Sequence, residues 1–209
     1  MKKLLTLLFS LFVLSSTSVF ADDISDFEIE GITIGDSLLD YMSEDEILEG
    51  IKFTKNHYSY LNEPNKYSEV YLIKDFPTYK SGLSFFIENN ASNQYITNKN
   101  EKFRILFIRG KIDYVEDFDS CIAKRNEIEE VLSKMFPNTE KTELVQAHSL
   151  DPSGNSIINN ISFFFKTGNK VRLVCSNWEE TFRIQNNFTE GLSIAIQPKK
   201  ITEWLSDYK

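Results

Sequence analysis

The sequence predicts an α+β protein in which antiparallel sheet is packed against helices on one face. Several segments alternate apolar and polar residues with a period of two, which is typical of strands. Short turns join most of these segments, so neighbouring strands should run antiparallel. Segments with helical spacing precede each group of strands, an order that favours α+β. The 209 residues are enough for a domain with a substantial core.

The first part of the chain should contain a strand, two short helices and a group of strands. Residues 27–34 (FEIEGITI) form the expected first strand. Asp36 or Ser37 then provides a cap for a helix through Leu38 and Leu39. The capping box Ser43–Glu46 predicts a second helix as far as Gly50. Further strands are expected at residues 58–61, 69–74, 82–88, 103–109 and 111–115, with a reversal at Arg109-Gly110 between the last two.

The same order then repeats. A helix is expected over residues 120–136 and ends before Pro137. Residues 167–169 (TGN) predict a hairpin turn, and Pro198 opens a closing helix over 198–208. The strands of this part are expected at residues 142–148, 157–166, 170–175 and 192–196. Residues 22–209 are therefore interpreted as one exported domain, with candidate tandem halves at 31–117 and 118–197, and residues 89–101 as its long polar loop.

The N-terminal 21 residues have the pattern of a secretory signal peptide. Two lysines at the start are followed by an apolar stretch over residues 4–14 and by a small-residue cleavage site that ends at Ala21. Residues 15–18 (SSTS) interrupt the apolar run before it reaches the length of a membrane helix. We expect cleavage after Ala21, a periplasmic location, and no integral membrane segment in the product.

The charge balance excludes several classes of partner. Lys and Arg total 23 against 31 for Asp and Glu, which gives a net charge of −8. A nucleic-acid-binding protein needs clustered cations to neutralise phosphates, and anionic lipid surfaces attract the same residues. Two cysteines and two histidines leave few thiolate or imidazole ligands for a metal, so no cofactor is expected and no metal-binding residue is assigned. The candidate partners are an envelope protein or a peptide.

Cys121 and Cys175 are predicted to form a disulfide. An even pair of cysteines in an exported chain is most simply one bridge. Cys175 follows Val171 and Leu173 on the inward face of a strand, and Cys121 shares a helix phase with apolar residues. A redox-active pair is the alternative, but the chain has no Cys-x-x-Cys motif.

Tyrosines are concentrated between residues 58 and 95. They are Tyr58, Tyr60, Tyr67, Tyr71, Tyr79 and Tyr95. An exposed tyrosine surface can bind a peptide or protein, since the side chain offers a large apolar area and a polar tip. Tyr58, Tyr60 and Tyr71 are the candidate binding residues. The alternative is ordinary sheet composition, in which aromatic residues are favoured anyway.

Gly35-Asp36-Ser37-Leu38 resembles the signature of the GDSL esterases and lipases, in which the serine is the nucleophile. That resemblance implies an ester hydrolase, but a nucleophilic serine needs a base that is held by a carboxylate. The family's Asp-x-x-His pattern fits neither His57 nor His148, because Thr54 and Val145 stand three residues before them. A helix cap is the alternative role for Ser37, and no catalytic residue is assigned.

Four acidic residues between positions 113 and 119 form a candidate Ca²⁺ site. They are Asp113, Glu116, Asp117 and Asp119. Their spacing is not that of an EF-hand loop. A solvated turn with favourable charge at a helix start is the other interpretation, and the sequence leaves the choice open.

Two resemblances concern the whole chain. The segments DFEIEGITIGDSLLDYMSEDEI and VRLVCSNW resemble a family of small exported bacterial proteins without a known activity. The helix-then-sheet order is similar to the fold shared by a small outer-membrane assembly lipoprotein and the β-lactamase inhibitor proteins. We therefore expect a soluble, exported, non-catalytic binding protein. A periplasmic GDSL-type hydrolase that uses Ser37 and a structural envelope protein are the alternatives.

Overall fold

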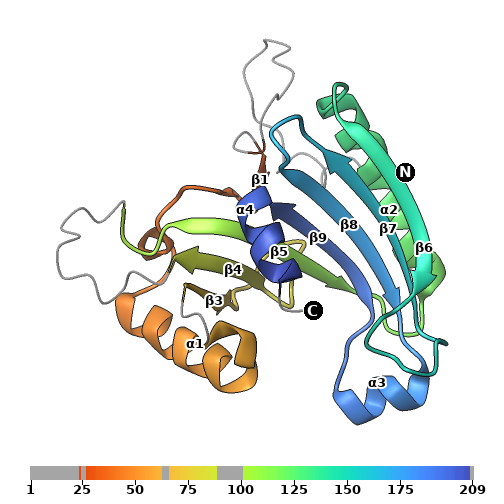
Figure 1. The fold of residues 1–209 in the computed structure, drawn as a ribbon, viewed down its shortest axis with the longest axis horizontal. Helices are drawn as coiled ribbons and strands as arrows, with labels where there is room; N and C mark the ends of the chain where they lie inside the picture. The colour runs from red at the N-terminus through yellow and green to blue at the C-terminus, as the bar shows by residue number, and fades with distance from the viewer. Residues whose placement is uncertain (1–23, 25–26, 63–65, 89–100, 208–209) are drawn as a thin grey trace.

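The computed structural model describes residues 24, 27–62, 66–88 and 101–207. A seven-stranded antiparallel sheet with the order β3-β4-β5-β9-β8-β7-β6 forms its centre (Figure 1). The strands are β3 (Tyr67–Leu72), β4 (Leu83–Glu88), β5 (Ile105–Asp113), β6 (Glu140–Ala147), β7 (Ile157–Phe164), β8 (Lys170–Asn177) and β9 (Gly191–Gln197). The predicted signal peptide and most of the predicted long loop lie outside the described residues.

Four α-helices accompany the sheet in the described part of the chain. They are α1 (Glu44–His57), α2 (Phe118–Met135), α3 (Glu180–Asn186) and α4 (Lys199–Ser206). A buried cluster on one face of the sheet includes residues of both α1 and α2. A second buried cluster, on the opposite face, joins Ile201 and Trp204 of α4 to Tyr67, Phe86 and Phe107. The α+β class is confirmed, and α4 lies on the face opposite to α1 and α2.

The N-terminal segment forms a small hairpin instead of the single expected strand. β1 (Glu28–Ile29) and β2 (Ile32–Thr33) pair antiparallel. Glu30 and Gly31 between them have positive φ values of 54° and 76°. This backbone conformation turns the chain, so the alternation that continues through residues 27–34 does not correspond to one strand.

Helix α1 begins at the predicted capping box but continues seven residues past Gly50, to His57. The backbone N–H of Ser43 donates to Glu46 Oε2 over 2.8 Å, and the backbone N–H of Glu46 donates to Ser43 Oγ over 3.4 Å. A Cβ atom at Gly50 would lie 3.0 Å from Val70 Cγ1 of β3. Gly50 therefore permits the close approach of α1 to the sheet and does not end the helix.

Three expected strands differ from the structure. Residues 59–61 form a short 3-10 helix, η4 (Ser59–Leu61), in which Leu61 is fully buried. The segments on either side of Arg109-Gly110 belong to one continuous strand, β5, without a reversal. A Cβ atom at Gly110 would lie 2.4 Å from the ring of Tyr79. The glycine makes room for this ring, and its presence was wrongly interpreted as a turn.

The second half of the chain follows the predicted order more closely. The TGN hairpin joins β7 to β8 in the expected place, with Phe163 opposite Val171. The sequence did not indicate α3, a seven-residue helix capped by the side chain of Glu179. The orders α1-β3-β4-β5 and α2-β6-β7-β8-β9 are alike, and the pairing of β5 with β9 joins the two sets of strands into one sheet.

The predicted disulfide is present and links α2 to β8. The sulfur atoms of Cys121 and Cys175 lie 2.01 Å apart, and both residues are buried. None of the helices in the described ranges has the length and apolar character needed to cross a bilayer.

Candidate functional site

The face of the sheet that carries α4 contains an open groove with a volume of about 760 Å³. Side chains of the central strands β5, β9 and β8 form its floor, and α4 forms one wall. Phe86, Phe107 and Leu205 make part of the lining apolar. Ser193 and Gln197 supply hydroxyl and amide groups beside them. The volume is within the range of ordinary ligand-binding pockets.

Three cations line the groove, and none of the described residues in its lining is acidic. They are Arg109, Lys170 and Arg172. Arg109 of β5 is the direct partner of Ala195 in β9, and Ala195 is the direct partner of Arg172 in β8. Residues directly opposite each other in antiparallel strands project from the same face. The two arginines therefore lie on the open face with the small side chain of Ala195 between them.

Arg172 has no compensating charge in the described part of the protein. Its side chain is half-buried, and it makes no hydrogen bond or ion pair with any described residue. This burial partly removes the charge from water and lowers the pKa of the guanidinium. Lys170, two residues before it on the same face, lies with Nζ 5.8 Å from the centre of the Phe164 ring.

Arg109 is held in place by a buried carboxylate. Its Nη2 donates to Glu69 Oε1 over 2.9 Å, and its Nε donates to Ser84 Oγ over 3.1 Å. The Glu69 side chain is only 2% exposed, whereas that of Arg109 is 41% exposed. Burial raises the pKa of Glu69, and the charge of Arg109 opposes this rise. The guanidinium is thus fixed from behind while its outer edge stays open to the groove.

The three tyrosines proposed from the sequence lie around Glu69. The hydroxyl of Tyr60 donates to Glu69 Oε2 over 3.4 Å, and Tyr60 also lines the groove. The rings of Tyr58 and Tyr60 are 5.7 Å apart, and Tyr58 is 38% exposed. Burial and the charge of Glu69 raise the pKa of Tyr71. Of these three tyrosines, Tyr60 lines the groove, whereas Tyr58 and Tyr71 lie beside it without lining it.

Two other described tyrosines of this segment do not join this surface. Tyr67 and Tyr79 are buried, with 0% and 7% exposure. Tyr95 lies outside the described residues. Of the described tyrosines in this segment, Tyr60 alone lines the groove, and a binding role for Tyr58, Tyr60 and Tyr71 stays a prediction.

Ser37 caps the short 3-10 helix η3 (Leu38–Asp40). Its hydroxyl donates to the carbonyl of Lys102 over 2.7 Å and accepts the N–H of Leu39 over 3.3 Å. The residue is 2% exposed. His57 bonds instead to the carbonyl of Phe53, and His148 accepts from the N–H of Leu150. The structure thus confirms the cap, and the described residues place no imidazole on the Ser37 hydroxyl.

The acidic residues near the start of α2 are used in separate contacts. Asp117 caps α2 by accepting from the N–H of Ser120, and Glu116 pairs with Arg183. Asp113 accepts from the hydroxyl of Ser81 over 2.5 Å. Across the described ranges, no group of three or more metal-ligating side chains comes together, and Asp119 is not part of one.

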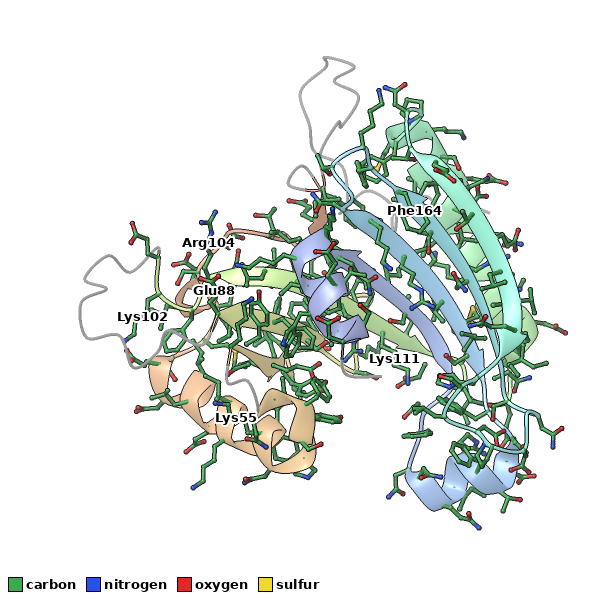
Figure 2. The ribbon with its side chains drawn as sticks, in the orientation of Figure 1. Lys55, Glu88, Lys102, Arg104, Lys111 and Phe164 are labelled. Atoms are coloured by element: carbon green, nitrogen blue, oxygen red, sulfur yellow. A yellow bond between two sulfur atoms is a disulfide. The ribbon has the colours of Figure 1, made fainter. Side chains whose placement is uncertain are left out.

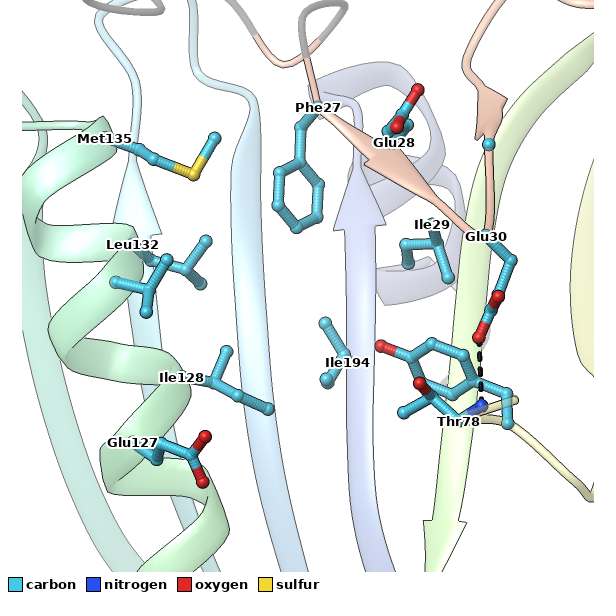
Figure 3. Close-up of a pocket in the computed structure, with 13 residues that line it drawn as sticks. Phe27, Glu28, Ile29, Glu30, Thr78, Glu127, Ile128, Leu132, Met135 and Ile194 are labelled. Atoms are coloured by element: carbon cyan, nitrogen blue, oxygen red, sulfur yellow. Dashed lines mark hydrogen bonds between the residues drawn. The ribbon is translucent and has the colours of Figure 1, made fainter. Parts of the chain in front are cut away.

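A smaller apolar pocket lies on the other face of the sheet. It is enclosed between α2, β1 and β9 and has a volume of about 70 Å³ (Figure 3). Phe27, Leu132 and Ile194 point into it, and Glu30 at its rim accepts from the N–H of Thr78 over 3.1 Å. This space is a gap in the core and is too small for a ligand of the size that the groove can hold.

The sequence interpretation missed Glu69, Arg109, Lys170 and Arg172. Arg172 carries a partial signal, because it alternates with apolar residues in a strand and must face away from the core. Its relation to Arg109 depends on the strand order, which places β9 between β5 and β8. The two residues are 63 positions apart in the chain, and nothing local connects them.

Comparisons with known proteins give no match. No family model matches this chain, and neither a curated protein nor a solved structure matches it. The resemblances stated from the sequence therefore stay predictions, and we infer the function from the geometry of the groove.

Proposed function

We propose that this chain is an exported, periplasmic binding protein that recognises an acidic ligand in the groove on the open face of its sheet. The observation that carries the proposal is the charge of the groove. Arg109, Lys170 and Arg172 line it, although the whole chain has a net charge of −8. Arg109 is paired with Glu69, whereas Arg172 has no counter-charge among the described residues, and a negatively charged ligand supplies one.

Arg172 gives the strongest support. A guanidinium offers five N–H donors in a fixed plane that suits carboxylate groups. A half-buried cation without a partner lowers the stability of the folded chain, so a purely structural role gives no reason for it. The apolar part of the groove and the ring of Tyr60 provide contact area for the uncharged portion of the ligand.

The alternative of a Ser37 ester hydrolase receives no comparable support. The hydroxyl of Ser37 is buried and donates to the carbonyl of Lys102. A serine in this state is a weak nucleophile without an adjacent base. We therefore place recognition before catalysis.

The test is binding of the mature protein to matched synthetic peptides. A Gly/Ser peptide that carries several Glu residues is compared by calorimetry with peptides that carry Gln or Lys at the same positions. We expect binding of the Glu peptide only, with an affinity that falls as salt is added. Arg172→Ala should weaken it about tenfold, since a hydrogen bond to a charged group contributes about 1.5–3 kcal/mol.

Arg104→Ala is the matched control. Arg104 is exposed just before β5, at the other end of this strand from Lys111 (Figure 2), and it does not line the groove. Its loss removes the same charge from the protein without changing the groove. Equal binding of the Glu and Gln peptides, or equal loss in the two variants, would contradict the proposal.

A further inference from the structure

This inference rests on the proposed function and concerns what the groove selects. We propose that the groove recognises acidic peptide segments that carry two carboxylates, one bound by Arg109 and the other by Arg172, with Ala195 as the spacer between them. A peptide with a single carboxylate then occupies only one of the two positions.

The spacing follows from the sheet. Arg109 and Arg172 are both direct partners of Ala195, so their strands are separated only by β9. Neighbouring strands lie about 4.8 Å apart, which places the two Cα atoms about 10 Å apart. The methyl group of Ala195 leaves the line between them open, whereas a larger residue would project into it.

The two guanidinium groups come from strands on opposite sides of β9. Arg109 is drawn towards β4 and β3, because its hydrogen bonds go to Ser84 and Glu69. Arg172, on the other side of β9, lies close enough to His148 for its charge to lower the pKa of that imidazole. The strands of the two arginines are separated by β9, so each guanidinium is assigned its own carboxylate of the ligand.

Both groups still have donors to offer. The described residues use two of the five N–H donors of Arg109, its Nε and one on Nη2. They use none of the donors of Arg172. Glu69 is a positioning residue in this arrangement, since it fixes the Arg109 guanidinium without covering its exposed edge.

The remaining lining fits a peptide between the two carboxylates. Ser193 and Gln197 flank Ala195 on β9 and project from the same face, so they offer a hydroxyl and an amide to peptide groups. Phe107 and Leu205 line the groove on the α4 side and offer an apolar surface to apolar side chains of the peptide. A phospholipid would need an unbroken apolar surface for its acyl chains. In this groove, apolar and polar lining residues are mixed.

The experiment varies the distance between two charges. Gly/Ser peptides that contain two Glu residues at increasing separation are titrated into the wild-type mature protein by calorimetry, together with a peptide that contains one Glu. We expect an optimum at an intermediate separation, with affinity about tenfold above that of the single-Glu peptide. Arg172→Gln should reduce the optimum to the level of the single-Glu peptide and remove the dependence on separation.

Arg109 is tested with the double variant Glu69→Gln/Arg109→Gln, because removal of the arginine alone leaves a buried charge without a partner. It should have the same effect as Arg172→Gln, whereas Arg104→Gln should keep the optimum. If the double variant does not fold, the ¹⁵Nε resonance of Arg109 in the wild-type protein gives a second measurement. The ¹⁵Nε resonances of Arg109 and Arg172 should both shift when the two-Glu peptide is added.

Affinity that increases with the number of Glu residues but not with their separation would overturn the inference and leave the proposed function intact. Equal affinity for the one-Glu and two-Glu peptides would also overturn the inference and leave the proposed function intact. Failure of every Glu peptide to bind better than its Gln counterpart contradicts the proposed function itself. Binding of anionic phospholipid vesicles in place of the peptides would overturn the inference, because the acidic ligand would then be a lipid.

Discussion

Glu69 and Arg109 form an ion pair that connects the buried side of β3 with the floor of the groove. Glu69 Oε1 and Arg109 Nη2 lie 2.9 Å apart, and the exposed fraction is 2% for the acidic side chain and 41% for the basic one. The pair is therefore asymmetric. The carboxylate depends on the guanidinium for its charge compensation, while the guanidinium also remains in contact with solvent.

This asymmetry predicts the effect of breaking the pair. Arg109→Ala should lower the free energy of unfolding at pH 7 by about 3 kcal/mol, because it leaves an ionised carboxylate in the interior. Urea unfolding measures the change. Glu69→Gln/Arg109→Gln is the control and should lose clearly less stability, since no buried charge remains. A double variant that loses as much as the single one would contradict the explanation.

The loss of stability in Arg109→Ala should depend on pH. Burial raises the pKa of Glu69, so the folded protein holds the proton more tightly than the unfolded chain. Protonation of this group therefore favours folding as the pH decreases through the folded pKa. The deficit of Arg109→Ala should shrink between pH 7 and about pH 4.5, the ordinary range of a Glu side chain. A deficit that stays constant would show that lost packing, not charge, causes it.

Asp151 should affect stability in the opposite direction. Its carboxylate accepts from the N–H and hydroxyl groups of Ser153 and Ser156 over 2.6–2.9 Å, and these bonds hold its pKa well below the usual range. A lowered folded pKa contributes stability above the unfolded value of about 3.9, and this contribution is lost as the pH falls. Asp151→Asn should therefore be less stable than the wild type at pH 7.

Urea unfolding at several pH values tests this expectation. The difference between the wild type and Asp151→Asn should decrease as the pH falls below about 4. Asp75→Asn is the control, because Asp75 is an exposed carboxylate of the same type. Its effect should be small at both ends of the range. A constant difference for Asp151→Asn would mean that ionisation of the carboxylate is not its cause.

The disulfide between Cys121 and Cys175 closes a loop with a sequence separation of 54. The chain-entropy model gives a stabilisation of about 4 kcal/mol for a loop of this length. The double variant Cys121→Ala/Cys175→Ala should show that loss in urea unfolding. A reductant present during unfolding should lower the wild-type midpoint and leave the variant unchanged. Two free thiols in protein isolated from its native compartment would contradict the bridge.

Ser37→Ala tests the structural role of the serine in the GDSL sequence. Loss of the cap should cost about 1 kcal/mol in urea unfolding. Ser59→Ala is the matched control, since Ser59 is exposed in a 3-10 helix that has no side-chain cap. A serine-directed phosphonate should label neither the wild type nor the variant. Labelling of the wild type that Ser37→Ala abolishes would restore the hydrolase hypothesis.

Local patterns determined much of the fold. The capping box at Ser43, the hairpin at residues 167–169 and the inward phases of Cys121 and Cys175 were all apparent in the sequence. Each of them depends on residues that are close in the chain or on a single periodic face. The physics of caps, turns and alternation acts over a few residues, so a sequence is enough to reveal it.

Two glycines show where this approach fails. Gly50 suggested the end of a helix and Gly110 suggested a turn, but each makes room for a side chain from a distant segment, Val70 and Tyr79 respectively. The absence of a side chain has the same appearance in a sequence whether the backbone turns or a neighbour approaches. Only the packing of the folded chain distinguishes the two.

The sequence by itself determined the composition, the α+β class and the disulfide partners, and it predicts an export signal. The tertiary structure decided the groove. Strand order brings Arg109 and Arg172 to either side of Ala195, although the three residues come from separate parts of the chain. An antiparallel sheet can order its strands in many ways, because the alternation within each strand fixes which residues face the core but not which strand lies beside it. For that reason the cations of the groove form a site only in the folded protein, where the strand order brings them together.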